Sequence, residues 1–351
     1  MNRYKQTSIV IFCMGVMLGL CAPAVAQDDS YELAFSNGNI FTVDTISGIA
    51  TQLTNGDRYA DSPTWSTDGT QIAFVQPLTD DFYGQYGLFV MNTDGGHLEQ
   101  IAGDLLWRSQ PIWLKTGDTL LYATSSGIKD GDCLIRSVAR DGSESQTIYR
   151  QGHTKCKVSA LSPQLSPDNT QILFGLDDPV GKYFQLYSMS LVNQQVKQLT
   201  DNRNNNGSAE WSPDGTQIAF NAIQDNQREI FVMDADGINM RRVTHRPGND
   251  YAPHWLADSK SLIFSSDQKG YNIFSLDVAT GVVRNLTNLT DSGAWNPVVS
   301  PDGTQIAYPT GVDPVGGADH IDVLTLATGE VHELTGVGAT AYSLAWRPLP
   351  K

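Results

Sequence analysis

The sequence predicts an all-β fold in which four-stranded antiparallel units close into a ring, a seven-bladed β-propeller. Three observations carry this prediction. A short string recurs along the chain, a strand–turn–strand pattern surrounds each copy, and the two ends of the chain carry complementary parts of one unit. No segment shows the roughly 3.6-residue period of an amphipathic helix, and repeated four-stranded units are typical of propeller blades.

The recurring string has the form Ser-Pro-Asp-Gly-Thr-Gln-Ile-Ala-Phe. It occurs with small changes at 66–74, 166–174, 212–220 and 300–308, and in weaker form at 114–122 and 256–264. Proline fixes the first corner of a turn, aspartate suits the second, and glycine takes the left-handed position. Each copy therefore predicts a hairpin. The bulky residues that precede the copies, together with Trp346, are anchors spaced 44 to 52 residues apart: Trp65, Trp113, Leu165, Trp211, Trp255, Val299 and Trp346.

A second hairpin follows each of these strings. In one unit it runs from Ile230 to Met233, turns through Asp-Ala-Asp-Gly, and returns at Arg242 to Thr244. Two hairpins in succession give four strands per unit. The five anchor tryptophans share one position in the repeat, so we expect them to pack between sheets. Trp107 and Trp295 fall outside that position and are predicted to be exposed.

The two ends of the chain predict how the ring closes. Residues 31–54 match the second, third and fourth strands of a unit, and residues 341–346 match a first strand that has no partners after it. One blade is therefore expected to contain strands from both termini, which would leave few free sheet edges. A six-bladed ring with one displaced unit is the alternative.

Residues 1–26 are predicted to be a signal peptide. Arg3 and Lys5 precede an apolar run that is short for a membrane span, and Ala24-Val25-Ala26 offers a cleavage site. The remainder, 27–351, is expected to be a single propeller domain, exported to the periplasm or the cell exterior, with no transmembrane segment. The alternatives are a lipoprotein modified at Cys21 and an uncleaved anchor.

Charge and cysteine content narrow the partners and cofactors. The formal net charge of −15 argues against nucleic acid and anionic membranes. In an oxidising compartment Cys133 and Cys156 could form a disulfide, the alternative being two free thiols. With two cysteines and scattered histidines, His254 among them, we expect no metal site and no cofactor. Turn formation accounts for the Asp-Gly strings without calcium.

The repeat resembles that of the TolB-like propeller family. The resemblance rests on Trp-Ser-Pro-Asp-Gly-Thr-Gln-Ile-Ala-Phe, followed by Ile-Phe-Val-Met-Asp-Ala-Asp-Gly and Leu/Val-Thr, and extends over 31–347. It implies the fold but little about function. The family's namesake is periplasmic, carries an α/β domain before its propeller, and binds a lipoprotein. This chain resembles the propeller alone, and it contains no G-x-S-x-G motif of the kind found in serine hydrolases.

Residues shortly before each anchor are expected to lie at one mouth of the central channel. Small or polar residues stand three positions before most anchors, as suits a wet channel. The candidate ligand-binding residues just before them are Asp61, Arg108, Asn206, Asp250, Trp295 and Tyr342. The leading hypothesis is a monomeric, non-catalytic module that binds a protein, peptide or glycan at this mouth. The alternatives are a polysaccharide lyase or hydrolase that uses carboxylates such as Asp61 and Asp250, and a structural subunit of an envelope complex.

Overall fold

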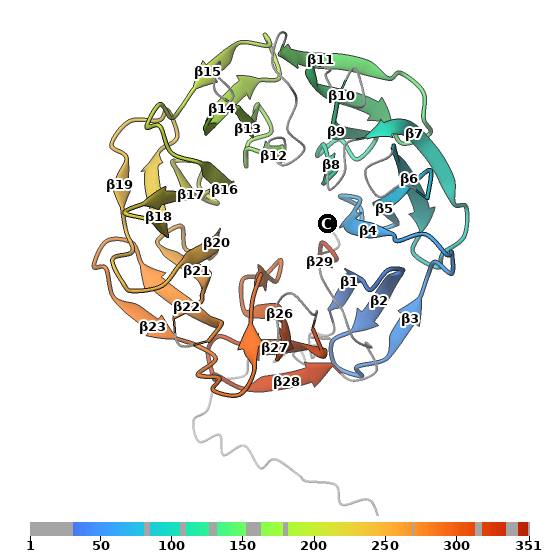
Figure 1. The fold of residues 1–351 in the computed structure, drawn as a ribbon. Coiled ribbons are helices and arrows are strands. Elements are labelled where there is room, and N and C mark those ends of the chain that lie inside the picture. The colour runs from blue at the N-terminus through green and yellow to red at the C-terminus, as the bar shows by residue number, and fades with distance from the viewer. Residues whose placement is uncertain are drawn as a thin grey trace, which may run out of the picture.

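The described residues form strands and turns, with no helix among them. The structure is a computed structural model that describes residues 31–80, 85–105, 110–125, 132–151, 163–177, 182–268, 270–312, 318–334 and 343–349. The strands surround a central opening in chain order, and each sheet extends from the opening to the outer wall (Figure 1). This arrangement is a propeller-like fold.

Strands at equivalent positions in the repeat occupy equivalent radial positions in Figure 1. The innermost strands are β4 (Asp61–Trp65), β8 (Ile112–Trp113), β12 (Gln164–Leu165), β16 (Asn206–Trp211), β20 (Asp250–Trp255), β24 (Gly293–Ala294), β25 (Val298–Val299) and β29 (Leu344–Trp346). The next strands outward are β1 (Glu32–Ser36), β5 (Gln71–Pro77), β9 (Thr119–Ser125), β13 (Gln171–Asp177), β17 (Gln217–Gln224), β21 (Ser261–Ser266) and β26 (Gln305–Gly311).

The outer half of each sheet is built in the same way. The third strands are β2 (Ile40–Asp44), β6 (Tyr86–Asn92), β10 (Cys133–Ala139), β14 (Phe184–Ser190), β18 (Gln227–Asp234), β22 (Asn272–Asp277) and β27 (His320–Thr325). The outermost strands are β3 (Ala50–Gln52), β7 (Glu99–Leu105), β11 (Gln146–Gln151), β15 (Val196–Gln198), β19 (Arg241–Arg242), β23 (Val283–Asn285) and β28 (Val331–Leu334).

Antiparallel pairing joins these strands into sheets. Within the described residues, four sheets have four strands each: β29-β1-β2-β3, β12 to β15, β16 to β19 and β20 to β23. A five-stranded sheet holds β26 to β28, with β24 and β25 both paired to β26. The remaining sheet has eight strands, because Leu105 of β7 pairs with Thr124 of β9 and so joins β4–β7 to β8–β11. The predicted four-stranded antiparallel unit is confirmed.

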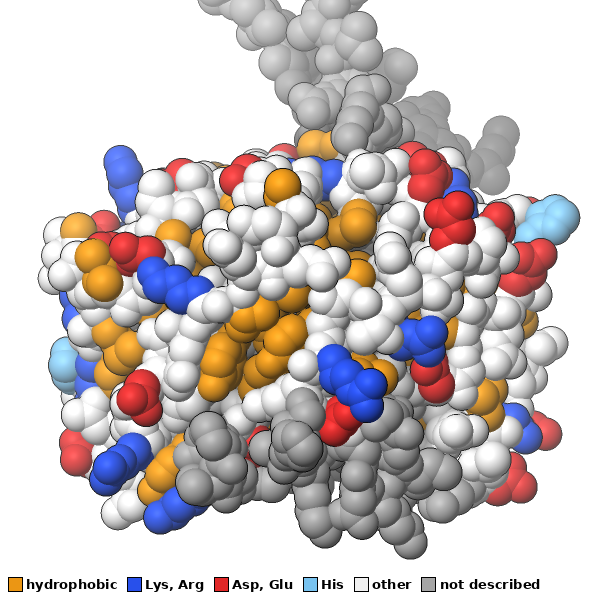
Figure 2. Space-filling model, turned by 90° about the horizontal axis from the view of Figure 1, so that it is seen from above, with side chains coloured by type: hydrophobic (Ala, Val, Ile, Leu, Met, Phe, Trp, Pro, Cys, Tyr) orange, Lys and Arg blue, Asp and Glu red, His pale blue; other side chains and the backbone are white. Residues whose placement is uncertain are grey.

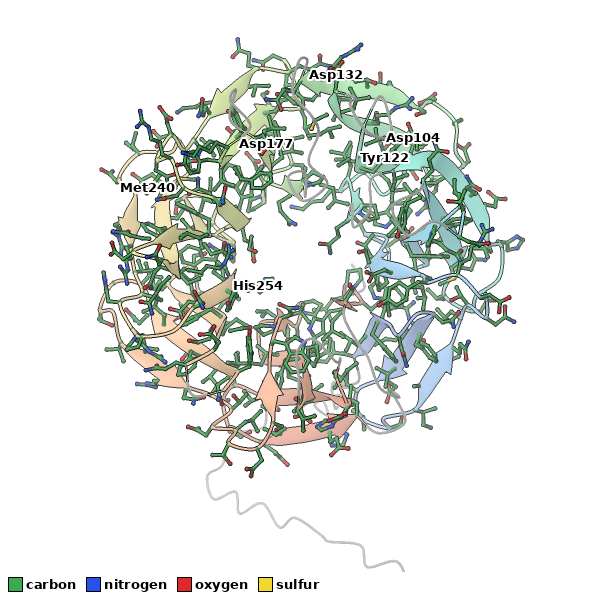
Figure 3. All side chains as sticks on the ribbon, in the orientation of Figure 1. Asp104, Tyr122, Asp132, Asp177, Met240 and His254 are labelled. Atoms are coloured by element: carbon green, nitrogen blue, oxygen red, sulfur yellow. The ribbon has the colours of Figure 1, made fainter. Side chains whose placement is uncertain are left out.

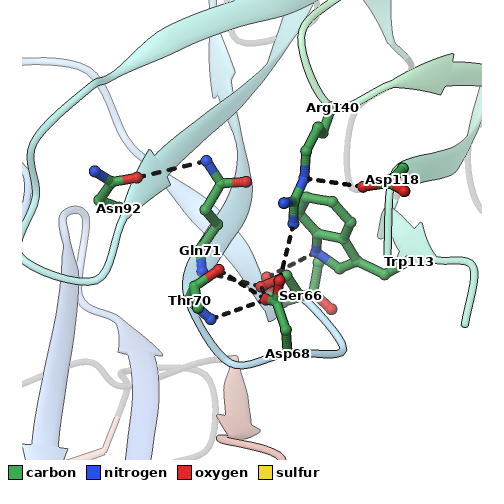
Figure 4. A network of polar contacts seen from close by, with 9 residues as sticks. Ser66, Asp68, Thr70, Gln71, Asn92, Trp113, Asp118 and Arg140 are labelled. Atoms are coloured by element: carbon green, nitrogen blue, oxygen red, sulfur yellow. Dashed lines mark hydrogen bonds and ion pairs between the residues drawn. The ribbon is translucent and has the colours of Figure 1, made fainter. Parts of the chain in front are cut away.

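The repeated turn is held by its own side chains. Between β4 and β5, the Ser66 hydroxyl donates to Asp68 Oδ1 at 2.6 Å and accepts from the Gln71 amide at 2.9 Å, while the Thr70 amide donates to the same Asp68 oxygen at 3.0 Å (Figure 4). These hydrogen bonds lower the pKa of Asp68 to about 2, against the opposing effect of burial. Gly69 adopts a φ of 67°, the left-handed conformation that the sequence predicts at this corner.

Matched aromatic pairs lie between the second and third strands of most sheets. Phe35 and Phe41 are directly opposite in the register of β1 and β2, and their rings stack at a centroid distance of 5.1 Å. The same pairing recurs at Phe220 and Phe231, where the distance is 5.6 Å. Cross-strand aromatic pairs contribute about 0.2–1 kcal/mol each, so the repeat stabilises these blades in the same way.

Most anchor tryptophans tie their innermost strand to the one before it. Trp65, Trp113, Trp211 and Trp255 are buried between sheets, as predicted. The Trp255 indole Nε1–H donates to the Glu210 carbonyl at 3.3 Å, and Trp113 donates to the Thr64 carbonyl at the same distance. In both cases the acceptor is the residue just before the preceding anchor. The core therefore lies between the sheets, and indole–carbonyl hydrogen bonds join neighbouring innermost strands near the channel.

The strand near the C-terminus pairs with the first described strand, as the sequence predicts. Phe35, Ala34 and Leu33 of β1 lie opposite Leu344, Ala345 and Trp346 of β29. The indoles continue the anchor pattern through this junction: Trp65 Nε1 donates to the Ala345 carbonyl at 2.9 Å, and Trp346 Nε1 donates to the Val298 carbonyl at 3.1 Å. The first and last strands of the described chain thus share one sheet.

The outer wall is chemically mixed. Seen from the side in Figure 2, cationic and anionic side chains are interspersed, and hydrophobic side chains gather in the middle of the visible wall. In the part of the chain that the structure describes, no helix has the length and apolarity that a bilayer crossing requires.

Candidate functional site

Of the predicted channel-mouth residues that the structure describes, three are buried: Asn206, Asp250 and Trp295. Asp61, Asn206 and Asp250 are the first residues of the innermost strands β4, β16 and β20. Trp295 lies between β24 and β25. Arg108 and Tyr342 lie outside the described residues.

A repeated bulge explains where these side chains go. Ser62, Ser208, Ala252 and Asn296, each three residues before an anchor, have φ values between 45° and 55°. In β4, β16 and β20 the register with the next strand breaks at this point. A bulge bends its strand and redirects side chains. The residue that opens the strand is thereby brought against the preceding sheet.

Asp61 and Asn206 fill structural roles at this position. Asp61 Oδ1 accepts hydrogen bonds from the hydroxyls of Ser36 at 3.0 Å and Ser343 at 2.7 Å, and so links β4 to β1 and to the residue before β29. The Asn206 amide nitrogen lies 2.9 Å from the Phe184 carbonyl and 3.2 Å from Gln185 Oε1 of the preceding sheet. Both side chains hold neighbouring sheets together.

Asp250 is buried, with 1% of its surface exposed. Neither of its carboxylate oxygens accepts a hydrogen bond from a described residue. Burial raises its pKa above the ordinary value of 3.8, because the nearby Ser266 and Thr244 hydroxyls and the charge of Arg246 oppose the desolvation only in part. A side chain in this position has no surface to offer a ligand.

The prediction that Trp295 is exposed is wrong. Only 5% of its surface is accessible, and it packs in a core cluster with Phe35, Ala307 and Ile321. Its ring also meets Tyr271 edge-on at a centroid distance of 6.5 Å. We expected exposure because Trp295 does not occupy the anchor position of the repeat. The inner strand is interrupted between β24 and β25, and there the Trp295 side chain packs between sheets.

A polar cavity of about 810 Å³ lies along the inner strands β12, β16 and β20. Its wall includes the whole run from Asn205 to Trp211, and it extends to Gln110, Gln164 and His254. This volume falls in the usual range of about 300–1,000 Å³ for small-molecule sites. Of the predicted residues, Asn206 is part of this wall.

A carboxylate–imidazole pair stands in the cavity. His254 Nδ1 lies 2.7 Å from Glu210 Oε2, and both side chains are about one third exposed. His254 is on β20, which borders the central opening (Figure 3). Burial lowers the pKa of His254, but the charge of Glu210 and its hydrogen bond outweigh burial, so the pKa is raised above the ordinary value of 6.5.

The sequence carries a signal for this pair that the channel-mouth prediction missed. Glu210 and His254 each stand just before an anchor tryptophan, in consecutive units. Equivalent positions on adjacent innermost strands lie side by side, so an acid and a histidine at this position predict a contact. Considering each histidine by itself does not reveal this contact between Glu210 and His254.

Arg228 supplies the cavity with a fixed positive charge. Its Nη1 donates to Asn221 Oδ1 at 2.8 Å, and its guanidinium carbon lies 5.7 Å from the centre of the Tyr251 ring. Both Arg228 and Asn221 line the cavity, and Asn221 is 2% exposed. No feature of the repeat distinguishes Arg228 in the sequence.

Trp211, also on the cavity wall, breaks the pattern of the anchor tryptophans. Its Nε1 is buried and has no hydrogen-bond partner among the described residues, whereas the indoles of Trp65, Trp113, Trp255 and Trp346 all donate to carbonyls. A net contribution of about 0.5–1.5 kcal/mol is typical for such a bond. The sheets of β12 and β16 therefore lack this tie beside the cavity.

The described residues contain no candidate metal centre, and they include one of the two cysteines of the predicted disulfide. Over the ranges that the structure describes, no three or more His, Cys, Asp or Glu side chains are grouped so that they could hold a metal ion. Cys133 is buried and disulfide-bonded. Cys156 lies outside the described residues, so the pairing of these two cysteines stays a prediction.

Comparison with known proteins places the fold in a family of diverse members. The chain is 26% identical over 299 residues to the Tol-Pal system protein TolB of Francisella tularensis subsp. tularensis (strain WY96-3418), covering 80% of this chain and 64% of TolB. It is 25% identical over 196 residues to the uncharacterized peptidase YuxL of Bacillus subtilis (strain 168), covering 56% of this chain and 26% of the peptidase. The chain thus spans less than two thirds of either relative.

A solved structure agrees on the fold. An oligogalacturonate lyase in complex with manganese superposes with a TM-score of 0.62 at 16% identity, covering 88% of this chain and 84% of the lyase. The TolB beta propeller domain family matches residues 134–348, which is more than half of the chain. The chain therefore belongs to the TolB beta propeller domain family.

Proposed function

We propose that the protein is an exported, non-catalytic binding module that takes a segment of a protein, peptide or glycan partner into the channel-side cavity. The observation that carries this proposal is the cavity itself, about 810 Å³ of polar space on the wall of the central channel. Its charged groups are held by neighbours before any ligand arrives, Glu210 by His254 and Arg228 by Asn221. Preorganised polar groups favour binding because little side-chain entropy is lost when a ligand docks.

The proposal includes a seven-bladed ring and a single chain per particle. We count β4–β7 and β8–β11 as separate blades, since one residue pair links them. We count β24 and β25 as one inner strand interrupted by the bulge at Asn296. We also propose that residues 1–26 are removed on export, that 27–351 form the propeller, and that Cys133 pairs with Cys156.

A second candidate function is a polysaccharide lyase or hydrolase that uses the same cavity. The Glu210–His254 pair favours it, because a carboxylate that orients an imidazole is a common arrangement in general acid–base catalysis. The raised pKa of His254 would keep the imidazole protonated to higher pH. A screen of acidic and neutral polysaccharides for new reducing ends separates the two candidates: product formation that His254→Gln abolishes would favour the enzyme.

Filling the cavity tests the binding function. Gln164 precedes an anchor, as Glu210 and His254 do, and lines the cavity. We expect Gln164→Trp to reduce recovery of the partner from the envelope and secreted fractions of the source organism by about tenfold or more, because the indole would occupy ligand space. Recovery is measured by quantitative mass spectrometry after capture on the immobilised protein.

The matched control is Gln195→Trp, which places the same ring on an exposed residue before the outermost strand β15. It should leave recovery unchanged. The cavity is not the working surface if Gln164→Trp, with an unfolding midpoint like that of the wild type, captures the same proteins in the same amounts. If the protein is instead a structural subunit of an envelope complex, recovery of its partners should fall when residues of the outer wall are substituted.

A further inference from the structure

Arg228 is positioned more firmly than a surface arginine. It is the second residue of β18, close to the turn from β17, and is partly buried. Its own amide donates to Asn249 Oδ1 at 2.9 Å, its guanidinium donates to Asn221, and the Tyr251 ring lies beneath it. The contacts with Asn221 and Tyr251 fix the direction of a long side chain that would otherwise lose entropy on binding, and the bond to Asn249 holds its main chain.

In the part of the chain that the structure describes, Arg228 has no directly bonded carboxylate; Asp267 reaches the Asn249 and Tyr251 side chains that Arg228 also contacts. Among the described residues, no carboxylate lies within ion-pair distance of it, whereas Arg136, Arg150 and Arg347 each pair with a carboxylate at 2.6 or 2.7 Å. Glu210, the acidic residue of the cavity wall, is engaged by His254. The cavity thus carries local positive charge in a protein whose formal net charge is −15. A partly buried cation without a counter-ion favours an anionic ligand.

The wall beside Arg228 includes an edge strand, on which the Glu210 carbonyl accepts from the Trp255 indole. β16 is the edge strand of its sheet, and residues 205–211 all line the cavity. The bulge between Gly207 and Glu210 leaves Ser208 and Ala209 outside the ladder with β17. Free main-chain groups on an edge strand are the basis on which extended peptides add to a sheet.

Amide and main-chain groups make up much of the polar part of the wall. Of its aromatic side chains, Phe174 is 1% and Trp211 is 5% exposed, while Phe184 is partly buried. The polar groups include the side chains of Asn205 and Gln110 and the main chain of β16. These groups match the alternating donors and acceptors of a peptide main chain.

We propose that the cavity binds an extended peptide segment that carries a carboxylate, with the carboxylate paired to Arg228 and the main chain beside β16, the edge strand of its sheet. This inference rests on the proposed binding function and specifies its ligand. The carboxylate belongs either to an acidic side chain or to a free C-terminus of the partner.

Selection from a random peptide library displayed with both blocked and free C-termini tests the proposal. The folded full chain is the bait, and recovered sequences are counted for Asp, Glu and terminal carboxylates. We expect enrichment of carboxylates. For one recovered peptide, Arg228→Gln should weaken binding about tenfold or more, as should replacing the peptide's carboxylate by an amide. The two changes together should cost no more than either alone, because both remove the same contact.

Arg284→Gln is the matched control, since it removes the same charge from an exposed residue of the outermost strand β23. It should leave affinity unchanged. The proposal is overturned if recovered peptides show no carboxylate enrichment, if no peptide is recovered, or if Arg228→Gln binds as the wild type does. It is also overturned if an oligouronate binds through Arg228 while peptides do not.

The outcomes also separate this inference from the binding function. If Gln164→Trp abolishes partner capture and Arg228→Gln does not, the cavity is the working surface and the assignment of the ligand is wrong. If neither variant changes capture, both proposals fail.

Discussion

Removing residues 343–351 is expected to destabilise the protein by about 5 kcal/mol or more. The truncation deletes β29, and with it the ladder that β29 forms with β1. It also removes the carbonyl that accepts from Trp65, the Trp346 indole that donates to Val298, and the Ser343 hydroxyl bound to Asp61. Loss of a tryptophan packed against a core typically costs up to about 3–5 kcal/mol, and each orphaned polar group adds to that cost.

The measurement is denaturant unfolding followed by tryptophan fluorescence, together with hydrogen exchange across β1. The control is a chain that ends at Pro348, which lacks the exposed Leu349 and the last two residues but keeps β29. It should unfold as the full chain does. An unchanged midpoint for the longer truncation would mean that pairing of the two termini does not stabilise the ring.

Replacing Arg242 by methionine is expected to cost about 3–5 kcal/mol at neutral pH, because it leaves an ionised carboxylate buried and unpaired. Arg242 is bonded to the Glu229 carboxylate, whose side chain is fully buried and also accepts from the Thr244 hydroxyl at 2.7 Å. The free energy of unfolding in denaturant measures the cost. Arg241→Met on the same strand is the control, because that residue is exposed and, among the described residues, its side chain donates to the Val278 carbonyl at 3.2 Å and to no carboxylate.

The stability cost of Arg242→Met should be smaller at low pH than at neutral pH. Burial raises the pKa of Glu229 above its ordinary value of 4.5, against the effects of Thr244 and Arg242. A raised pKa means that the folded state holds the proton more tightly, so this group stabilises the fold at low pH and loses that contribution as pH rises through the folded-state pKa. The cost of Arg242→Met should therefore shrink as the pH is lowered toward 4.5. A cost that grows on acidification would contradict this assignment.

The repeat made most of the fold predictable. Strand order follows from the fixed spacing between anchors and from the turn residues Asp68 and Gly69. Ring closure follows from the match between residues 31–54 and residues 341–346, which carry different strands of one unit. These features depend only on local sequence and on the symmetry of the repeat. Burial at the start of the inner strands was not predictable in the same way. Asp250 and Trp295 occupy positions that resemble a loop in the sequence, but the chain turns with a positive φ at Ala252 and Asn296 and both side chains are buried.

The candidate site depends on departures from the repeat. Glu210 and His254 could have been paired from their equivalent positions before consecutive anchors. The contacts of Arg228 could not be predicted in this way. Asn221 lies on the second strand of the same sheet and Tyr251 on the first strand of the next sheet, so the three residues occupy different positions in the repeat. The missing hydrogen bond of Trp211 is likewise invisible in a sequence where all anchor tryptophans look alike.

Hydrogen–deuterium exchange of the full chain with and without a captured ligand tests most directly whether the channel-side cavity is the working surface. The cavity assignment predicts slower exchange in residues 205–211 and 250–255, the inner strands β16 and β20 that border it. Protection confined to outermost strands such as β19 and β23, with the inner strands unchanged, would contradict it.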